Sequence, residues 1–305
     1  MAAGNSDTRK VLATLSYVKR FAGQTVLIKI GGAALEDLAL VRSICEGLML
    51  IRSVGVKVVL VHGGGPAINR ELTTHGLTWE FIDGQRVTTP EMMDVIEMVL
   101  CGHVNKRIVR QLNQQGVRAV GMSGSDGSTL LCKQASSKLG QVGAIERVNT
   151  ALLESLIAGE GDCIPVIAPI GIGKNGKAFN INADWAAARL AQGLGIKKML
   201  FLTDQDGILG ADKKVIPEID AGELEQLIEN GVVAGGMLAK TRTIIHALRN
   251  GVTDVHVLNA RHPHGLIEEL FTDRGIGTAC RLRSLGTAPR LDATASAKES
   301  LHARD

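Results

Sequence analysis

Aromatic residues are scarce in this chain: two Trp, one Tyr and five Phe occur among 305 residues. Stacking platforms for single-stranded nucleic acid need several exposed rings, and a net charge of +3 provides no basic surface, so nucleic acid is not an expected partner. No run of about 18 uncharged apolar residues occurs, so neither a transmembrane helix nor a membrane partner is expected. The first ten residues lack the apolar core of a signal peptide, which predicts a cytoplasmic protein.

Paired cysteines are lacking as well. The five cysteines contain no CxxC pair and their number is odd, so we expect reduced, mostly buried thiols and no metal site built from side chains. Glycine, by contrast, is abundant, with 36 residues in 305. An average protein has about 7% glycine, and an excess indicates tight turns or close approach of the backbone to a ligand.

Short apolar runs alternate with longer helical patterns along the chain. Several runs are apolar at nearly every position, which is typical of strands covered on both faces. The predicted strands are Thr25–Ile30, Val56–His62, Val117–Met122, Ile164–Ile170, Lys198–Thr203 and Thr253–Leu258. The predicted helices are 34–54, 66–75, 90–115, 150–159, 184–194, 222–230, 236–250 and 264–271. This order predicts an α/β fold, namely a three-layer αβα sandwich with a largely parallel central sheet.

Two terminal segments differ from this pattern. Residues 1–24 form an extension before the first strand, in which Leu15 and Val18 share one face of a helix predicted over 10–21. That helix packs either on its own subunit or on a partner. Residues 281–305 are poor in large apolar side chains, so we expect a flexible tail.

A lysine and two glycines end the first predicted strand. Lys29 lies beside Gly31 and Gly32, whose backbone N–H groups are not shielded by a side chain. Such an arrangement is suited to phosphate oxygens. A solvated lysine followed by an ordinary glycine turn would explain the same residues equally well.

The sequence HGGGP at 62–66 is a stronger signal. Its glycines, including Gly64 and Gly65, lie between an apolar strand and a helix with Pro at its start. Unshielded N–H groups and the helix dipole would both attract an anion there, and a plain loop rarely needs three glycines. We expect His62 to be a packed residue rather than a base.

Polar residues precede two further predicted helices. Asn182 and Asp184 fit a helix start, with Asn182 as the cap, but a helix start does not explain Asn180. After Gly235-Gly236, Lys240 is predicted in the first turn of a helix, where the helix dipole disfavours a cation. That placement indicates a compensating anion, with a solvated lysine as the alternative.

Arg86, within GQRVT at 84–88, is a candidate carboxylate ligand, because a guanidinium binds a carboxylate through two hydrogen bonds. Standing alone, it would be one surface arginine among many. The segment GMSGSDG at 121–127 also has two possible interpretations: it is either a binding loop or a flexible turn.

The segment GIGKNGKA at 171–178 nearly spells the P-loop of nucleotide-binding proteins. However, Ala178 replaces the hydroxyl residue that binds the metal there, and the residues after it are predicted to be extended rather than helical. We therefore interpret Lys174-Asn175-Gly176 as the tip of a hairpin.

Together these segments resemble the amino-acid kinase family, and most specifically its branch that acts on N-acetyl-L-glutamate. The resemblance covers residues 10–280 and implies a carbamate-kinase-like fold. The motifs that carry it, in the order of the family, are KIGG at 29–32, HGGGP at 62–66, GQRVT at 84–88, GMSGSDG at 121–127, FNINAD at 179–184, LTDQDGIL at 202–209 and GGMLAK at 235–240.

The resemblance implies phosphoryl transfer from ATP to the side-chain carboxylate of N-acetyl-L-glutamate in arginine biosynthesis, with Mg²⁺ held mainly by the nucleotide. It implies a catalytic set of Lys29, Lys240, Asp184, Gly32 and Gly64. The implied acceptor ligands are Gly64, Gly65, Arg86 and Asn180. The implied nucleotide ligands are Lys29, Gly31, Thr203, Asp204, Gly207, Leu209 and Lys240.

Two other segments resemble the arginine-inhibited, hexameric branch of the family. Residues 13–23 are similar to its N-terminal helix, and residues 264–278 to its arginine-binding segment, with Glu269 and Gly275 at matching positions. The resemblance therefore implies feedback inhibition by L-arginine and a homo-hexamer, a trimer of dimers linked by the N-terminal helix. A PII-type nitrogen regulator is a further expected partner.

This interpretation divides the chain into an N-lobe over 25–195 that binds the amino acid and a C-lobe over 196–280 that binds ATP. Alternative functions remain open at this point. One is a sister kinase acting on N-acetyl-aminoadipate or carbamate. The former is the harder to exclude, because it differs from N-acetyl-glutamate by one methylene, which changes binding by only about 1–3 kcal/mol. The other is a catalytically silent arginine sensor or regulatory partner, against which the presence of Lys29, Asp184 and Lys240 argues.

Overall fold

The computed structural model describes residues 12, 15–158, 162–272 and 275–282. The predicted tail beyond residue 282 and the start of the predicted N-terminal helix lie outside these described residues. Within them, no helix has the length and apolar character that crossing a membrane requires.

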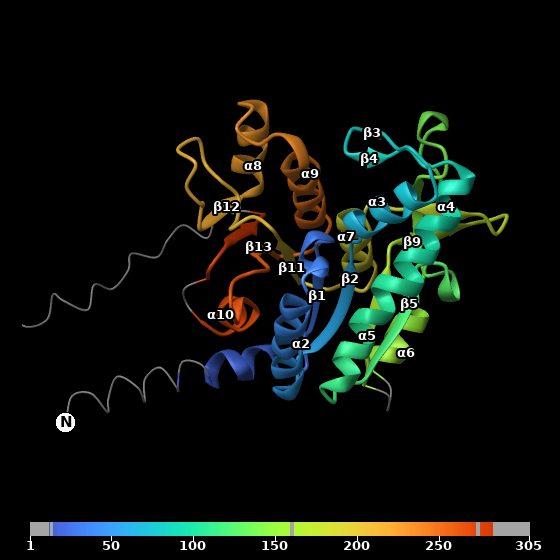
Figure 1. Cartoon of the computed structure of the whole chain (residues 1–305). Coiled ribbons are helices and arrows are strands. Elements are labelled where there is room, and N and C mark those ends of the chain that lie inside the picture. The colour runs from blue at the N-terminus through green and yellow to red at the C-terminus, as the bar shows by residue number, and fades with distance from the viewer. Residues whose placement is uncertain (1–11, 13–14, 159–161, 273–274, 283–305) are drawn as a thin grey trace, which may run out of the picture.

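One large sheet of eight strands runs through the molecule (Figure 1). Every neighbouring pair is parallel except β13 with β14. In spatial order the strands are β12 (Glu218–Asp220), β14 (Thr278–Arg281), β13 (Asp254–Asn259), β11 (Lys198–Thr203), β1 (Thr25–Ile30), β2 (Lys57–His62), β8 (Ile164–Ala168) and β5 (Ala119–Ser123). The largely parallel sheet is confirmed, and the sheet continues across the predicted lobe boundary because β1 pairs with β11.

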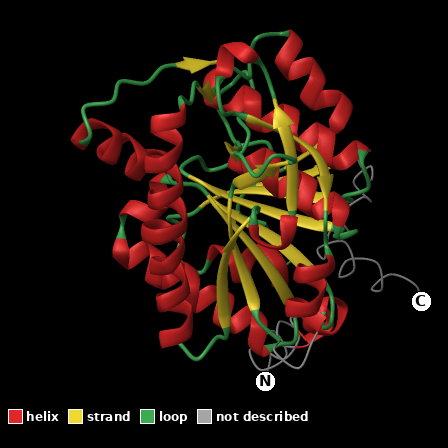
Figure 2. Ribbon diagram, turned by 90° about the vertical axis from the view of Figure 1, so that its right-hand side faces the viewer, coloured by secondary structure: helices red, strands yellow, loops and turns green. Residues whose placement is uncertain are grey.

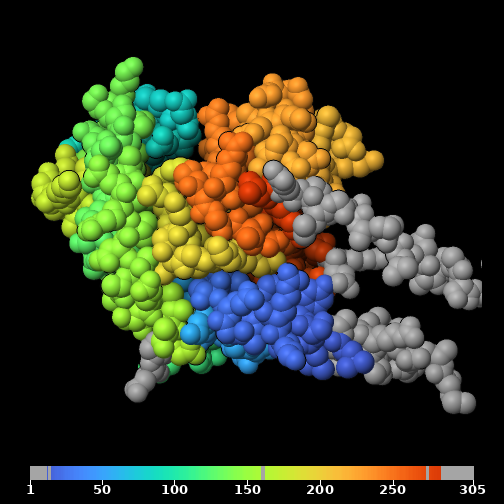
Figure 3. Space-filling view, turned by 180° about the vertical axis from the view of Figure 1, so that it is seen from behind, coloured from blue at the N-terminus to red at the C-terminus, as the bar shows by residue number. Residues whose placement is uncertain are grey.

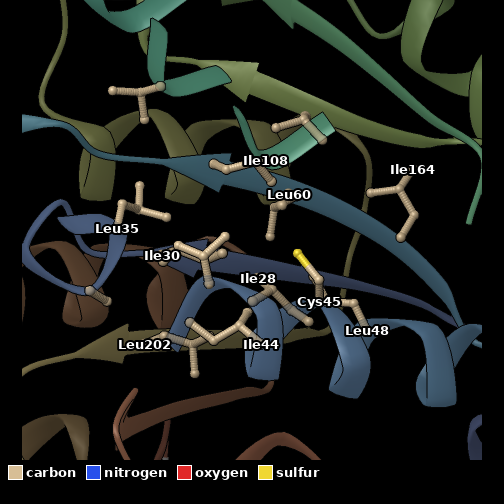
Figure 4. Packing of buried hydrophobic residues seen from close by; sticks show 14 of the residues in the cluster. Ile28, Ile30, Leu35, Ile44, Cys45, Leu48, Leu60, Ile108, Ile164 and Leu202 are labelled. Carbon is tan, nitrogen blue, oxygen red and sulfur yellow. The ribbon is translucent and has the colours of Figure 1, made fainter. Parts of the chain in front are cut away.

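Helices cover both faces of this sheet, so the three-layer αβα sandwich is confirmed (Figure 2). One face packs against α2 (Leu38–Ser53), α5 (Asn105–Gln114) and α10 (Gly265–Phe271). The other packs against α6 (Ala151–Ala158), α7 (Ala183–Gly193), α8 (Ala221–Glu229) and α9 (Gly235–Arg249). Side chains of β1 alternate between the two cores: Ile28 faces α2, as Figure 4 shows beside Ile44 and Leu48, whereas Leu27 lies in the other core.

Residues 81–180 add two smaller sheets, of which the sequence analysis predicted only the hairpin tip at 174–176. One contains β10 (Ala178–Asn180), β9 (Ile170–Gly173), β6 (Leu130–Gln134) and β7 (Gly143–Val148), and the other is the hairpin of β3 (Phe81–Ile82) and β4 (Gln85–Arg86). The sequence analysis also missed β12 and β14 of the large sheet. The single strand predicted over Ile164–Ile170 was wrong at its end. A bend at Pro169 separates β8 from β9, and the chain passes there from the large sheet to a small one.

Two predicted helices are interrupted. The helix predicted over 34–54 begins with a 3-10 turn, Ala33–Glu36, and α2 starts afresh after Asp37, whose side chain accepts hydrogen bonds from the first turn. The helix predicted over 90–115 consists of α4 (Pro90–Glu97), a π-helical segment (Met98–Val104) and α5. The other predicted helices, including α3 (Gly65–Thr74), lie within two residues of their predicted ends.

The N-terminal helix packs on its own chain. Residues 15–21 are helical, and the buried ring of Phe21 meets that of Phe271 in α10 edge to face, with centroids 6.1 Å apart. Seen from behind, this blue segment and α2 lie along one side of the molecule, and yellow α7 lies between the green and orange parts of the chain (Figure 3).

Candidate active site

Two cavities adjoin at the ends of the central strands. The larger has a volume of about 530 Å³ and the smaller about 280 Å³. Both are lined by Lys29, near the carboxyl end of β1, and by Gly32 in the loop that follows. Open α/β sheets bind ligands beyond the carboxyl ends of their strands, so this is the expected location for a site.

Three charged side chains meet where the cavities join. Lys29 Nζ lies 2.7 Å from Asp184 Oδ1, and Lys240 Nζ lies 2.7 Å from Asp184 Oδ2. Burial would raise the pKa of the Asp184 carboxyl, but the two ammonium groups outweigh it and hold that pKa below its ordinary value. Burial and the nearby charge of Lys29 lower the pKa of Lys240. One carboxylate thus holds two lysines in place, and these three groups together carry one net positive charge. The next carboxylate is that of Asp204, whose charge acts on Lys240.

The prediction that Lys240 lies in the first turn of its helix was wrong. Helix α9 begins at Gly235, so Lys240 is its sixth residue and lies beyond the turn where the dipole acts most strongly. Gly236 and Met237, in the first turn, line the larger cavity instead. The lysine therefore owes its position to Asp184, 56 residues away, rather than to a helix dipole.

Two glycine loops approach each other backbone to backbone. A Cβ atom on Gly32 would lie 2.8 Å from the Gly65 nitrogen and 2.9 Å from the Gly64 nitrogen, so no side chain fits there. Gly65 is the first residue of α3, and its N–H therefore has no acceptor within the helix. The prediction that these glycines surround one site is consistent with this geometry.

Arg86 lies in the smaller cavity under a pair of aromatic rings. Its guanidinium carbon is 4.7 Å from the Phe81 ring centroid and 5.5 Å from that of Trp79, and Nη2 donates a hydrogen bond to Asn69 Oδ1. Its Nη1 is buried and has no hydrogen-bond partner among the described residues. Burial lowers the pKa of Arg86 to about 10, which still leaves it charged at neutral pH.

Asn180 lines the same cavity, at the end of β10, and donates a hydrogen bond to Thr88 Oγ1 at 3.1 Å. Asn182 is the N-cap of α7, as predicted, because its side chain accepts hydrogen bonds from the N–H groups of Asp184 and Trp185. All four predicted acceptor residues line this cavity: Gly64, Gly65, Arg86 and Asn180.

The larger cavity contains every residue predicted to bind the nucleotide. These are Lys29, Gly31, Thr203, Asp204, Gly207, Leu209 and Lys240. Sequence reasoning missed its apolar wall, namely Val232, Val233, Ala234 and Met237. It also missed the apolar lining of the smaller cavity, in which Phe81, Leu100, Val142 and Ile181 take part. The apolar run directly before Gly235 was the one available signal for the first of these walls.

Two further motifs lie outside the residues that line these cavities. The segment at 171–178 is the turn between antiparallel strands β9 and β10, with Gly176 at φ +79°, so it is a hairpin tip as predicted and not a P-loop. The segment at 121–127 folds onto itself, because Asp126 Oδ2 accepts hydrogen bonds from the Ser123 N–H and hydroxyl.

Glu269 and Gly275 come together at the other end of the sheet. Buried Glu269 pairs with His256 Nδ1, while its Oε2 accepts a hydrogen bond from the Ile276 N–H at 2.8 Å. A Cβ atom on Gly275 would lie 2.9 Å from that same oxygen. Lys198 Nζ contacts His256 Nε2 at 2.8 Å.

Comparison with known proteins identifies relatives of the chain. Residues 24–259 match the model of the amino acid kinase family. The curated acetylglutamate kinase of Vesicomyosocius okutanii subsp. Calyptogena okutanii (strain HA) is 42% identical over 276 residues, which cover 87% of this chain and 89% of that protein.

Solved structures share the fold. An N-acetylglutamate synthase from Neisseria gonorrhoeae, complexed with coenzyme A and N-acetyl-glutamate, has a TM-score of 0.81 and 25% identity. The match covers 91% of this chain, which spans only 64% of the synthase chain. The carbamate kinase from Giardia lamblia bound to AMP-PNP has a TM-score of 0.63 and 17% identity over 85% of this chain and 99% of its own. From the family model and the curated relative, we conclude that this chain belongs to the amino acid kinase family, among the acetylglutamate kinases.

Proposed function

We propose that this protein transfers the γ-phosphoryl group of ATP to the side-chain carboxylate of N-acetyl-L-glutamate and forms an acyl phosphate for arginine biosynthesis. The observation that carries the proposal is the meeting of two cavities at Lys29, Asp184 and Lys240. One cavity is available to each substrate, and the net positive charge of these three groups lies between the two cavities.

The larger cavity takes ATP in this proposal. Its lining comes from the loop after β1 and from residues 203–240, so the second half of the sheet serves the nucleotide. Asp204 is the one carboxylate among the lining residues, since Asp184 lines the smaller cavity and is occupied by two lysines. Mg²⁺ prefers oxygen ligands, so it would be held mainly by the nucleotide, with Asp204 as the carboxylate of this chain available to it, and it would neutralise negative charge on the phosphates.

The smaller cavity takes N-acetyl-L-glutamate. Its lining residues all fall within 29–184, so the first half of the sheet serves the acceptor. The unpartnered Nη1 of Arg86 offers a donor for the α-carboxylate, and the Asn180 amide is a candidate partner for the acetamido group. The side-chain carboxylate then extends toward Gly64 and the lysines.

The reaction needs charge stabilisation more than proton transfer. A carboxylate acceptor is already ionised at neutral pH, so no general base is required. The transferred group passes through a loose transition state whose negative charge is spread over its oxygens. Lys29, Lys240 and the N–H groups of Gly32 and Gly64 are arranged to bind those oxygens, and Asp184 fixes both lysines beforehand.

Trapping of the acyl phosphate with hydroxylamine tests this function. Purified protein is incubated with MgATP and, separately, N-acetyl-L-glutamate, N-acetyl-L-aminoadipate, N-acetyl-L-aspartate and carbamate. The proposal predicts hydroxamate and ADP with N-acetyl-L-glutamate, and loss of both in folded Lys29→Ala and Lys240→Ala variants. Greater turnover with another acid would contradict the substrate, and no ADP with any acid would favour the silent sensor.

We also propose inhibition by L-arginine at Glu269, supported by the way in which Glu269 and Gly275 come together. Glu269 Oε2 accepts a hydrogen bond from the Ile276 N–H, and a Cβ atom on Gly275 would lie 2.9 Å from the same oxygen, so this buried carboxylate lies directly against the segment that resembles an arginine-binding segment. Phe21 joins the N-terminal helix to α10, which carries Glu269. In this proposal the same helix links dimers into a hexamer, on which a PII-type regulator acts.

An arginine titration tests the inhibition. Wild-type turnover should fall with added L-arginine, and Glu269→Gln should require at least tenfold more for the same inhibition. L-Lysine is the control ligand. Sedimentation analysis then measures the mass: a hexamer is expected for the wild type and a dimer after removal of residues 1–24. Turnover that does not respond to L-arginine would contradict the inhibition.

A further inference from the structure

His62 is the last residue of β2 and has no exposed surface. Its Nδ1 lies 2.9 Å from the carbonyl oxygen of Gly63, and its Nε2 lies 3.1 Å from Asn105 Nδ2. The sequence analysis assigned it no chemistry. Its two contacts nevertheless connect the start of α5 to the glycine loop that lines the smaller cavity.

Asn105 determines which ring nitrogen of His62 carries the proton. Its Nδ2 also donates to the carbonyl oxygen of Val166 in β8, at 2.8 Å, so the amide nitrogen and not the oxygen faces His62. Nε2 must therefore accept, and the proton of the neutral ring lies on Nδ1, which donates to Gly63 O. Burial lowers the pKa of His62 to about 4, so the ring is neutral at physiological pH.

The hydrogen bond to Gly63 fixes the orientation of a catalytically important peptide. A trans peptide is planar, and its C=O and N–H point in opposite directions. No peptide bond among the described residues is cis. When Nδ1 holds the Gly63 carbonyl, the N–H of Gly64 must therefore point away from His62.

Other contacts hold the same loop. The Gly63 N–H donates to the Ile30 carbonyl at 2.8 Å, which ties the loop to β1. Leu100 of the π-helical segment lies against Gly64, because a Cβ atom there would be 2.5 Å from Leu100 Cδ2. Gly121 makes room for Asn105: a Cβ atom at Gly121 would lie 1.9 Å from Asn105 Oδ1.

We propose that His62, oriented by Asn105, is a positioning residue that turns the Gly64 N–H toward the transferring phosphoryl group. This inference rests on the proposed function, in which Gly64 donates to that group. A donor held in place before the reaction contributes more than one that must reorient, and losing one such donor costs on the order of 10²–10³ in turnover.

Two isosteric substitutions separate the roles of the two ring nitrogens. His62→Asn keeps an N–H donor two bonds from Cβ, at the place of Nδ1, whereas His62→Gln moves it to the place of Nε2. Both replace the ring with an amide of similar polarity, so a general loss of packing affects both. The structure predicts kcat within about threefold of wild type for His62→Asn and a loss of about 10–100-fold for His62→Gln. KM for ATP should be unchanged in both.

The hydroxamate assay with N-acetyl-L-glutamate provides kcat, and thermal unfolding verifies that both variants are folded. Absence of hydroxamate from the wild type would contradict the proposed function itself. An active wild type with equal losses in the two variants, or with His62→Gln within threefold, would overturn only the positioning role.

A measurement on the unmodified protein covers the case in which the variants do not fold. Long-range ¹H–¹⁵N spectra of imidazole groups distinguish a ring protonated at Nδ1 from one protonated at Nε2. His62 is expected to carry its proton on Nδ1 from pH 5.5 to 8. A ring protonated at Nε2, or one that gains a second proton in this range, would overturn the inference.

Discussion

The molecule buries two clusters of charge, at opposite ends of the same strands. Beyond the carboxyl ends, Asp184 holds Lys29 and Lys240, and both cavities open beside them. At the amino ends of β11 and β13, Glu269 accepts from His256 and from a backbone N–H. The first cluster has two positive charges and one negative charge, and it lies beside space for an anion. In the second cluster, the carboxylate of Glu269 already accepts hydrogen bonds from donors of its own chain. The contrast indicates that free space beside a net positive charge, rather than buried charge alone, marks the reaction site.

The largest expected effect on kcat comes from replacing one lysine in each charge cluster by methionine. Lys240→Met should lower kcat by about 10²–10³, because a preorganised cation is lost from the transition state. Lys198→Met, an identical change at another lysine that contacts a buried partner, should keep kcat within about threefold. The hydroxamate assay measures both. Equal losses of kcat in the two variants would contradict the distinction between the two clusters, because both lysines would then contribute equally to turnover.

A buried histidine at each end of the sheet makes the free energy of unfolding depend on pH. Burial lowers the pKa of His62 to about 4 from its ordinary value of 6.5, so between these pH values the unfolded chain binds a proton that the folded chain does not. The free energy of unfolding should therefore fall by about 3 kcal/mol as the pH drops from 6.5 to 4, at about 1.4 kcal/mol per pH unit. Burial also lowers the pKa of His256, but Glu269 opposes the shift there.

Denaturant unfolding at pH 7 and pH 4 measures this difference. His62→Asn should be less sensitive to acid than the wild type by the amount that His62 contributes. His256→Asn is the matched control at the other end of the sheet. It should reduce the loss of unfolding free energy between pH 7 and pH 4 by less than His62→Asn does. A wild type and a His62→Asn variant that lose the same stability would contradict the assignment of a neutral, buried ring.

A smaller effect distinguishes the two carboxylates. Glu269→Gln should lower the free energy of unfolding by about 1–3 kcal/mol, because a buried charge-assisted hydrogen-bond network loses its acceptor. Asp184→Asn should lower kcat as well as the free energy of unfolding, because it releases the two lysines that it positions and leaves their buried charges unpaired. Unfolding and turnover are measured on both variants. A Glu269→Gln variant as stable as the wild type would show that its hydrogen bonds contribute nothing net.

The smallest expected effect concerns the acceptor. Arg86→Lys should raise KM for N-acetyl-L-glutamate about tenfold and leave KM for ATP unchanged, because a lysine cannot bind a carboxylate through two parallel hydrogen bonds. Steady-state kinetics with each substrate varied in turn measure both constants. Arg70→Lys, at an exposed arginine outside the residues that line the cavities, is the control. A rise in KM for ATP instead would show that Arg86 contributes to nucleotide binding, which would contradict its assignment to the acceptor.

Six of the eight strands of the central sheet could be predicted from the sequence, whereas β12 and β14 were missed. The charged, polar and glycine residues of both cavities were predicted through the resemblance to the amino-acid kinase family, but the apolar linings were not. Strands β1 and β11 are apolar almost throughout because both of their faces are covered, so their limits are visible in the residues alone. The motifs at the cavities are visible because glycines and lone cations at strand ends are unusual in a sheet that otherwise buries apolar residues.

The remainder depended on contacts that a linear pattern does not contain. Four strands of the small sheets, β3, β4, β9 and β10, span only two to four residues, and alternation over so few residues carries little information. Nothing marks Asn105 as special within a helical pattern, and only the fold brings it to His62. The position of Lys240 was misjudged because it is the fifth residue even of a helix that starts at Gly236, and α9 begins one residue earlier still, at Gly235.

The most direct test is a crystal structure of the complex with N-acetyl-L-glutamate and a non-hydrolysable ATP analogue. The terminal phosphoryl group should lie within hydrogen-bond distance, about 2.7–3.2 Å, of both Lys29 Nζ and Lys240 Nζ. The acceptor carboxylate should face it from the smaller cavity, in line with the bond that breaks. A nucleotide whose terminal phosphate lies beyond the reach of either lysine, or an acceptor bound outside the smaller cavity, would contradict the account.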